Sequence, residues 1–286
     1  MTRFSRIALT LLLLPTLASA GHETSFARVA ENDQKQPLAL QVAINSYGLK
    51  TGYRQIRVDL IGAIHIGDKA YYAVLNERFK TYDALLYELI APKDTIVERG
   101  ESQSRGVLSN TQLAMKNMLG LSFQLDEVDY AARNFVHADL SPQELTQSMR
   151  DRGESLYVYF WRLFYASMNQ YARDPLGLGD MQKLSAMLSG SSDNRFKVML
   201  AYELVDMDRY REILGEDEDS AVIGARNQRA IDVLREQLKA GRRQLAIFYG
   251  VAHMPDMEQR LTEQLGFTYL DTTWVDAWML GDQAGK

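Results

Sequence analysis

The sequence predicts an α/β fold, with α+β character, in which a central mixed sheet carries a large helical insertion. Three observations support this prediction. Apolar, strand-like segments gather at both ends of the chain, the middle has helical periodicity, and a strand–Gly-x-x-His–helix–strand pattern occurs twice. A chain of 286 residues with 46% hydrophobic and 24% charged residues can form a substantial core. We expect one domain over residues 21–286, with the helical insertion at about 96–240.

Strands and one helix alternate in the N-terminal part of the expected domain. Alternating apolar and polar side chains predict strands, and turn residues between the first two strands predict a hairpin. Apolar residues at Tyr72, Leu75 and Phe79 have helical spacing. The expected elements, in order, are a polar lead-in at 21–37, a strand at 38–47, a turn at 48–52, a strand at 54–64, a helix at 68–80 and a strand at 84–90.

Helical periodicity dominates the insertion. Ser141, Pro142 and Glu144 have the order of an N-cap, a first helical proline and an acidic third residue. Residues 156–171 are rich in aromatics and predict a buried helix, and residues 221–240 predict a long amphipathic helix. Strand-like segments then return. The expected C-terminal elements are a strand at 244–249, a helix at 256–265 and strands at 267–270 and 273–280.

The first twenty residues have the pattern of a secretory signal peptide. Arg3 and Arg6 precede a continuous apolar run at 7–14, and Ala18-Ser19-Ala20 supplies the small residues of a cleavage site. We expect cleavage near Ala20 and a mature protein that is secreted or periplasmic. The apolar run is shorter than the roughly 20 residues that a spanning helix needs. The sequence therefore predicts no transmembrane segment in the mature chain.

Composition and missing motifs exclude several classes of function. The chain has no cysteine, which excludes thiol catalysis, iron–sulfur clusters, Cys-based zinc sites and disulfides. A net charge of −5 argues against nucleic acid as a partner, because phosphate binding needs clustered Lys and Arg. The sequence has neither the His-Glu-x-x-His motif of zinc proteases nor the Gly-x-Ser-x-Gly elbow of serine hydrolases. It shows no symmetric interface, so the oligomeric state stays unknown.

Two of the four histidines lie in matching contexts. His65 comes three residues after Gly62, and His253 comes three residues after Gly250. Each pair stands between a predicted strand and a predicted helix. Ligands in α/β sheets bind at the carboxyl ends of strands, and glycine permits close backbone approach. A single histidine at a strand end is more often structural, but the repeated pattern predicts two imidazoles that face one pocket.

Glu88 is the next candidate, because it ends the apolar strand predicted at 84–90. A buried carboxylate is costly unless it is paired or ligating. Two interpretations stay open: a salt bridge to an arginine, or a metal ligand or general base beside His65. Arg226, on the helix predicted at 221–240, is either a solvated residue or the cation that pairs with Glu88 or stabilises an anionic transition state.

His137 and Asp139 form a His-x-Asp pair in a segment that we expect to be extended. Side chains two residues apart on a strand share a face, so the two can line a site together. The alternative is that Asp139 or Ser141 caps the helix that follows. The sequence does not decide between these two interpretations.

Together these residues resemble the motifs of the TraB/PrgY/GumN family, whose animal relatives are the Tiki metalloproteases, and more distantly the erythromycin-esterase and ChaN-like proteins. The similarity spans roughly Val42 to Leu280 and is sharp only at the motifs. The resemblance implies a divalent metal such as Mn²⁺ or Co²⁺ and a hydrolytic reaction. The residues that carry it are Gly62-Ala63-Ile64-His65, Tyr87-Glu88-Leu89, Arg226-Asn227 and Gly250-Val251-Ala252-His253.

Three functions are compatible with these residues. The first is an exported metal-dependent hydrolase that cleaves a peptide or ester bond of a peptide or small-molecule substrate. In it His65, Glu88 and His253 hold Mn²⁺, Co²⁺ or Zn²⁺, and Arg226 assists catalysis. The second is a metal-free esterase in which a histidine and Glu88 activate water. The third is a binding protein for a peptide signal or haem.

The binding hypothesis depends on an aromatic face in the predicted helix at 156–171. Aromatic residues are also the usual content of a packed core, and this simpler interpretation is the more frequent one. Haem binding that requires His65 or His253 would distinguish the two. The aromatic residues are Tyr157, Tyr159, Phe160, Trp161, Phe164 and Tyr165.

Overall fold

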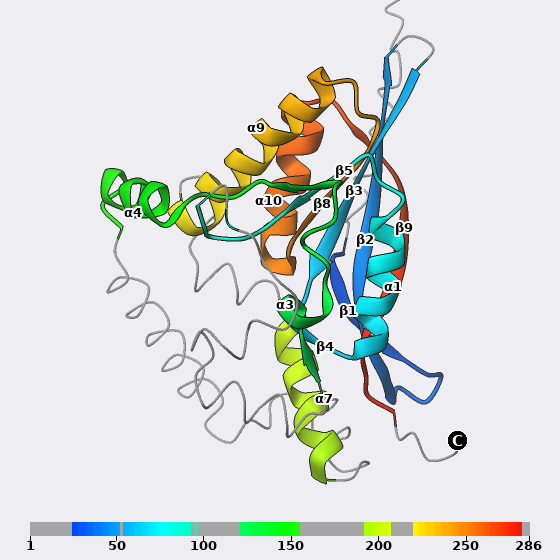
Figure 1. Cartoon of the computed structure of the whole chain (residues 1–286). Coiled ribbons are helices and arrows are strands. Elements are labelled where there is room, and N and C mark those ends of the chain that lie inside the picture. Colours follow the sequence, from blue (N-terminus) through cyan, green and yellow to red (C-terminus); the bar gives the residue numbers. More distant parts are fainter. Residues whose placement is uncertain are drawn as a thin grey trace, which may run out of the picture.

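The main feature of the molecule is a seven-stranded mixed sheet with helices on both faces (Figure 1). This computed structural model describes residues 25–51, 54–92, 95, 121–154, 192–206 and 220–281. The predicted α/β fold with a central mixed sheet is confirmed. The predicted signal peptide and the aromatic segment at 156–171 lie outside the described residues.

The long strand β2 (Pro37–Thr51) organises the antiparallel half of the sheet. It pairs with β1 (Ala27–Glu31) and β3 (Arg54–Ala63), and with β9 (Thr268–Met279) along its other side. The predicted β2–β3 hairpin is present, but the turn expected at 48–52 is wrong for residues 48–51, because β2 continues to Thr51 and pairs with β3 there. The expectation of a loose lead-in at 21–37 is wrong for residues 27–31, because this five-residue segment forms β1, which is too short to give a clear strand signal in the sequence.

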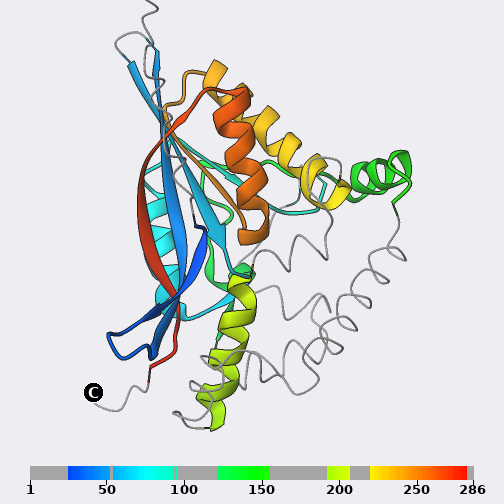
Figure 2. The same ribbon diagram turned by 180° about the vertical axis from the view of Figure 1, so that it is seen from behind.

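β9 corrects a second expectation, because it is one strand where two were predicted. The segment breaks its apolar–polar alternation near Leu270, which resembles a turn in the sequence. In the structure the register with β2 shifts between Ser46 and Tyr47, and this bulge absorbs the irregularity. Figure 2 shows β9 following the curved outer side of β2.

The parallel half of the sheet consists of four short strands. β3 is followed across the sheet by β8 (Gln244–Gly250), β5 (Ala84–Tyr87) and β7 (Phe135–His137), each parallel to its neighbour. β7 lies inside the segment expected to be a helical insertion. That insertion is therefore not wholly helical, and a strand of three residues is too short to produce a periodic signal in the sequence.

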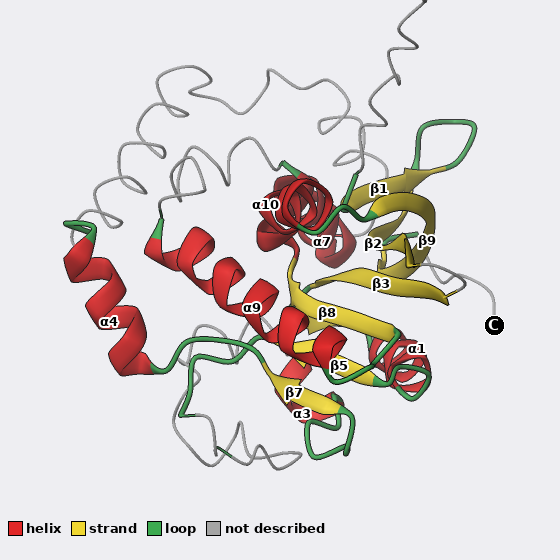
Figure 3. Cartoon of the chain, turned by 90° about the horizontal axis from the view of Figure 1, so that it is seen from above, coloured by secondary structure: helices red, strands yellow, loops and turns green. Residues whose placement is uncertain are grey.

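Helices cover the two faces of the sheet. α1 (Lys69–Phe79) packs on one face, and α9 (Arg226–Lys239) and α10 (Met254–Gln259) pack side by side on the other (Figure 3). In the described part of the chain no helix is both long and apolar enough to cross a bilayer. The remaining elements are β4 (Ile66–Gly67), β6 (Ser122–Phe123), α3 (Gln124–Glu127), α4 (Pro142–Asp151), α7 (Ser192–Val205), η3 (Ala221–Ala225), η4 (Val251–His253) and η5 (Arg260–Gln264).

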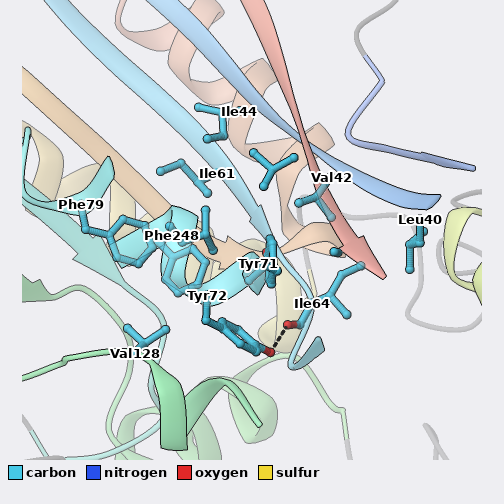
Figure 4. Packing of buried hydrophobic residues seen from close by; sticks show 14 of the residues in the cluster. Leu40, Val42, Ile44, Ile61, Ile64, Tyr71, Tyr72, Phe79, Val128 and Phe248 are labelled. Atoms are coloured by element: carbon cyan, nitrogen blue, oxygen red, sulfur yellow. Dashed lines mark hydrogen bonds between the residues drawn. The ribbon is translucent and has the colours of Figure 1, made fainter. Parts of the chain in front are cut away.

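Successive side chains of β8 point to opposite faces of the sheet and belong to two separate parts of the hydrophobic core. Phe248 faces the α1 side, whereas Ile247 and Tyr249 face α9 and α10. On the α1 side, the Tyr72 hydroxyl donates a hydrogen bond to the carbonyl of Ile64 at 2.9 Å (Figure 4). The Tyr71 hydroxyl donates to Gly62 at 3.3 Å. The core thereby fixes the backbone that leads from β3 to His65.

The two strand–Gly-x-x-His–helix–strand segments have the same order of elements but differ in their pairing. In the first, β5 pairs in parallel with β8. In the second, β9 pairs antiparallel with β2. An internal repeat therefore stays a prediction. The predicted capping box of α4 is present, with Ser141 and Glu144 each accepting from the other's backbone N–H.

A buried carboxylate ties β3 to α1. Asp59 is 1% exposed, and its oxygens accept from Arg57 at 3.0 Å, Arg78 at 3.0 Å and Tyr82 at 2.6 Å. Burial alone would raise the pKa of Asp59, but hydrogen bonds from Tyr82, Ser46 and the two arginines outweigh it and leave the pKa lowered.

Replacing Asp59 with Asn should lower the free energy of unfolding by about 2 kcal/mol at pH 7, because charge-assisted hydrogen bonds are lost. Because the pKa of Asp59 is lower in the folded state than in the unfolded state, ionised Asp59 stabilises the fold at pH values above its unfolded-state pKa. That stabilisation is lost as the pH falls through the folded-state pKa. The difference between wild type and Asp59→Asn should therefore shrink below about pH 4. Urea unfolding at pH 7 and pH 3 measures it, and an equal difference at both pH values would contradict this account.

Candidate functional site

The four parallel strands end at one edge of the sheet, and each is followed by a residue predicted for the site. Their carboxyl ends align, since Ala63 pairs with Gly250, and Tyr87 pairs with both Phe248 and His137. This is the edge at which α/β sheets bind ligands. The residues that follow are His65 after β3, Glu88 after β5, Asp139 after β7 and His253 after β8.

Glu88 is the carboxylate at the centre of this edge. Its Oε1 accepts from Arg226 Nη2 at 2.6 Å, and its Oε2 accepts from the backbone N–H of Gly250 at 2.6 Å. Burial favours the neutral acid, but the positive charges of His253, when protonated, and of Arg226 lower the pKa of Glu88 to about 2. Glu88 is therefore an anion at neutral pH.

Arg226 is the fixed cation of the site. It is 5% exposed, and its Nε and Nη2 donate to the two carboxylate oxygens of Asp139 at 2.9 and 2.6 Å. Burial acts to lower the pKa of Arg226, but Asp139 and Glu88 outweigh it and raise the pKa above its usual value. The pairing with Glu88 predicted from the sequence is present. Because these N–H groups already donate to carboxylates of the protein, Arg226 is better placed to hold Glu88 and Asp139 than to bind a substrate.

His253 is buried, and each of its ring nitrogens has a hydrogen-bond partner. Its Nε2 lies 3.3 Å from Arg226 Nη1, which can only donate, so Nε2 is the acceptor. Its Nδ1 then carries the proton and donates to Asn227 Oδ1 at 2.7 Å. Burial lowers the pKa of His253 to about 4 against the attraction of Glu88, so the ring is neutral at pH 7.

Asn227 is held so that its carbonyl oxygen faces His253. Its Nδ2 donates to the backbone carbonyl of His253 at 3.0 Å and to Asp256 Oδ2 at 2.7 Å. Asp256 also accepts from Arg260 Nε at 2.7 Å. Because both donors of the amide are used, its oxygen is the atom left for the imidazole.

His65 reaches the same edge of the sheet and is exposed to solvent. Its Nδ1 lies 3.2 Å from Gln124 Oε1. The Gln124 amide nitrogen donates to the hydroxyl of Tyr130 at 2.7 Å, so the oxygen faces His65 as an acceptor. In the neutral ring, Nδ1 then carries the proton and Nε2 has the free lone pair.

Gly250 lies where the three side chains converge. A Cβ at this position would be 3.3 Å from Glu88 Oε2, 3.6 Å from His65 Nε2 and 3.7 Å from His253 Cδ2. The histidines of the two motifs are therefore a few ångströms apart, as the shared pocket requires. Gly62 lies elsewhere, since a Cβ there would meet Val251 Cγ2 at 3.3 Å and the carbonyl of Phe26 at 3.5 Å.

In the structure His137 and Asp139 have different hydrogen-bond partners. Asp139 joins the centre through Arg226, and its Oδ1 also accepts from the N–H of Leu140 at 2.7 Å. Capping of α4 falls to Ser141 alone. The Nε2 of His137 donates to the carbonyl of Leu89 at 2.7 Å. Asp139 therefore contacts Arg226, whereas His137 bonds the chain next to Glu88, and whether the two line one site together stays a prediction.

Sequence reasoning missed three residues of the site: Gln124, Tyr130 and Asp256. Gln124 and Tyr130 follow a two-residue strand, β6, which produces no periodic signal. Asp256 was visible three residues after His253, but a polar residue there is indistinguishable from a helix-start residue. Asp256 follows His253 at the same spacing as Asp68 follows His65, whereas Gln124 and Tyr130 belong to no repeated pattern.

The donor chemistry at this edge fits a divalent cation. Two imidazole Nε2 atoms and the Glu88 carboxylate are nitrogen and oxygen donors of the kind that Mn²⁺, Co²⁺ and Zn²⁺ accept. His253 Nε2 and Glu88 Oε1 are 3.6 Å apart, short enough to share one ion at about 2.1 Å from each. Among the described residues no group of three His, Cys, Asp or Glu is already arranged around such a point. A third ligand requires an adjustment of His65, which is exposed.

These motif residues come from distant parts of the chain and meet at one edge of the sheet. Their convergence is what a shared site requires, whereas the resemblance to the TraB/PrgY/GumN family rests on the sequence motifs alone. Comparison of the chain with protein-family models, with curated proteins and with solved structures finds no match.

Proposed function

We propose that this chain is an exported metal-dependent hydrolase of the TraB/PrgY/GumN type, which cleaves a peptide or ester bond. The observation that carries the proposal is the arrangement of His65 and His253 around Glu88. Each imidazole has an amide oxygen at Nδ1. Nε2 of His65 lies 3.6 Å from the position of a Cβ on Gly250, and Nε2 of His253, which accepts from Arg226 at 3.3 Å, would exchange that contact for the ion. Histidines that ligate metals characteristically donate their other ring N–H to such an acceptor.

The charge balance of the site supports a cation. Glu88 and Asp139 contribute two carboxylates, and Arg226 contributes the one guanidinium that contacts both. With neutral imidazoles, the centre keeps one net negative charge in a largely buried environment. Uncompensated buried charge is costly, so a bound cation would be stabilised there.

The metal-free alternative loses support at two of its residues, Glu88 and His253. A general base works best when its pKa lies near the operating pH. Glu88, with a pKa of about 2, and His253, with a pKa of about 4, are weak bases at neutral pH. Both are instead in the deprotonated form that a metal ligand needs.

Each residue of the site has a distinct role in this proposal. His65, Glu88 and His253 would hold the ion, which lowers the pKa of a bound water toward neutrality. Arg226 and the Gly250 N–H fix the direction of the Glu88 carboxylate. Asp139 fixes Arg226. The substrate is a peptide or small molecule, and export follows from the signal-peptide pattern.

Metal counting tests the proposal. Purified protein is loaded with Mn²⁺, Co²⁺ or Zn²⁺, freed of excess ion and measured by elemental analysis. We expect about one ion per chain in the wild type, as a single site requires, and none in His65→Ala or His253→Ala.

His137→Ala is the matched control, because this histidine hydrogen-bonds the carbonyl of Leu89 and is not one of the three proposed ligands. It should retain the ion. Folded wild-type protein that keeps no metal would overturn the metal-dependent mechanism and favour the metal-free esterase. Loss of the ion in His137→Ala as well would show that the ion is held elsewhere.

A further inference from the structure

We propose that Gln124 is a positioning residue for His65, which holds the ring in the Nδ1–H form with the Nε2 lone pair facing Glu88. The inference rests on the proposed function only in treating Nε2 of His65 as the working atom. Three observations carry it: the strand register that brings Gln124 to His65, the bond that orients its amide, and a matching device at His253.

The register of a small ladder places Gln124 beside His65. β4 pairs antiparallel with β6, with Ile66 opposite Phe123 and Gly67 opposite Ser122. The next pair outward is His65 and Gln124, and the Gln124 N–H donates to the carbonyl of His65 at 2.9 Å. The main chains of His65 and Gln124 are therefore hydrogen-bonded at the same position as their side chains, which keeps the two residues adjacent.

Tyr130 is the hydrogen-bond partner of the other end of the Gln124 amide. The Gln124 Nε2 donates to the Tyr130 hydroxyl at 2.7 Å, which turns Oε1 toward the imidazole. Tyr130 is 6% exposed, and burial raises its pKa above the usual value, so the hydroxyl stays neutral. A ring nitrogen that faces a carbonyl oxygen must carry the proton.

The same device holds His253. Asn227 presents its oxygen to Nδ1 at 2.7 Å, and Asp256 accepts from the Asn227 amide at 2.7 Å, as Tyr130 does from Gln124. Two unrelated segments thus supply the same three-part arrangement of polar acceptor, amide and imidazole. A chance hydrogen bond to an exposed histidine would not be expected to reproduce it.

Imidazole tautomers can be read directly from two-bond ¹⁵N–¹H correlation spectra of the purified protein, with His65 assigned by its loss in His65→Ala. We expect Nδ1–H in the wild type. Gln124→Met, which keeps length but removes the acceptor, should move His65 toward Nε2–H, whereas Gln124→Glu should retain Nδ1–H. His253 is the internal control and should not change. Affinity for Co²⁺ alone should fall about 10–100-fold in Gln124→Met and recover in Gln124→Glu.

Gln147→Met is the matched control, since Gln147 is an exposed amide on α4 that contacts only its own helix through Asp151. It should change neither the tautomer nor the affinity. If Gln124→Met does not fold, Tyr130→Phe frees the amide to turn and should give mixed tautomers. An unchanged His65 tautomer in Gln124→Met, or Nε2–H in the wild type, would overturn the inference. Wild-type protein that binds no Co²⁺ would overturn the proposed function. The His65 tautomers of wild type and Gln124→Met would still test the role of Gln124.

Discussion

Replacing Arg226 with methionine is expected to lower the free energy of unfolding by about 3–5 kcal/mol, because two buried carboxylates lose their shared cation. Asp139 is 1% exposed and receives two hydrogen bonds from Arg226. Glu88 receives one more from the same guanidinium. Methionine restores the length of the side chain but none of these donors. The loss is a large part of the about 5–15 kcal/mol that stabilises a typical domain.

Arg229→Met supplies the matched control one turn further along α9. Arg229 pairs with Glu144, and both side chains are partly exposed, at 27% and 41%. An exposed pair of this kind contributes about 0–1 kcal/mol. Urea unfolding of both variants measures the difference. Arg226→Lys keeps the positive charge but loses the forked geometry of the guanidinium. Its loss of unfolding free energy should therefore fall between those of the two methionine variants. Equal losses in Arg226→Met and Arg229→Met would show that Arg226 has no special role in the site.

Replacing Gly250 with alanine is expected to weaken metal binding by about 100-fold while the fold persists. Gly250 has φ −49° and ψ 139°, which alanine adopts without strain. The added methyl would lie within 3.7 Å of Glu88, His65 and His253 at once, where the proposed ion and its water belong. Stability should change by less than about 1 kcal/mol, which thermal unfolding can check.

Gly62→Ala is the counterpart in the first motif, and it should show the opposite pattern. Its methyl would press on Val251 and on the Phe26 carbonyl, not on the site. We expect a loss of about 1 kcal/mol in stability with metal affinity unchanged. Isothermal titration with Co²⁺ compares the two variants. The proposed centre would be contradicted if Gly250→Ala bound Co²⁺ as tightly as the wild type.

The residues at the strand ends were predictable because they follow strands that leave a clear sequence signal. His65, Glu88 and His253 each follow an apolar run, and the position at the carboxyl end of a parallel strand determines their place. Asp139 stayed ambiguous because β7 has only three residues and resembles a loop. Its role depends on a neighbour, Arg226, that is distant in sequence.

Other parts of the site could not be derived from local pattern. Gln124 reaches His65 through a ladder of two residue pairs, which leaves no periodicity to detect. Burial of Arg226 depends on α9 lying against the sheet after a π-helical turn at 221–225. Both are outcomes of tertiary packing between segments far apart in the chain, and neither residue type indicates its partner.

The order of strands in the sheet also constrains how the protein can assemble. β8 lies between β3 and β5, yet it is the last of these three to leave a ribosome or an export channel. Until residues 244–250 arrive, β3 and β5 each present an unpaired edge that favours aggregation. These contacts link distant residues, which slows folding. A nascent chain of this protein must therefore remain protected until almost nine-tenths of it has emerged, and a fragment that stops before β8 has neither a continuous sheet nor Gly250 and His253 of the proposed site.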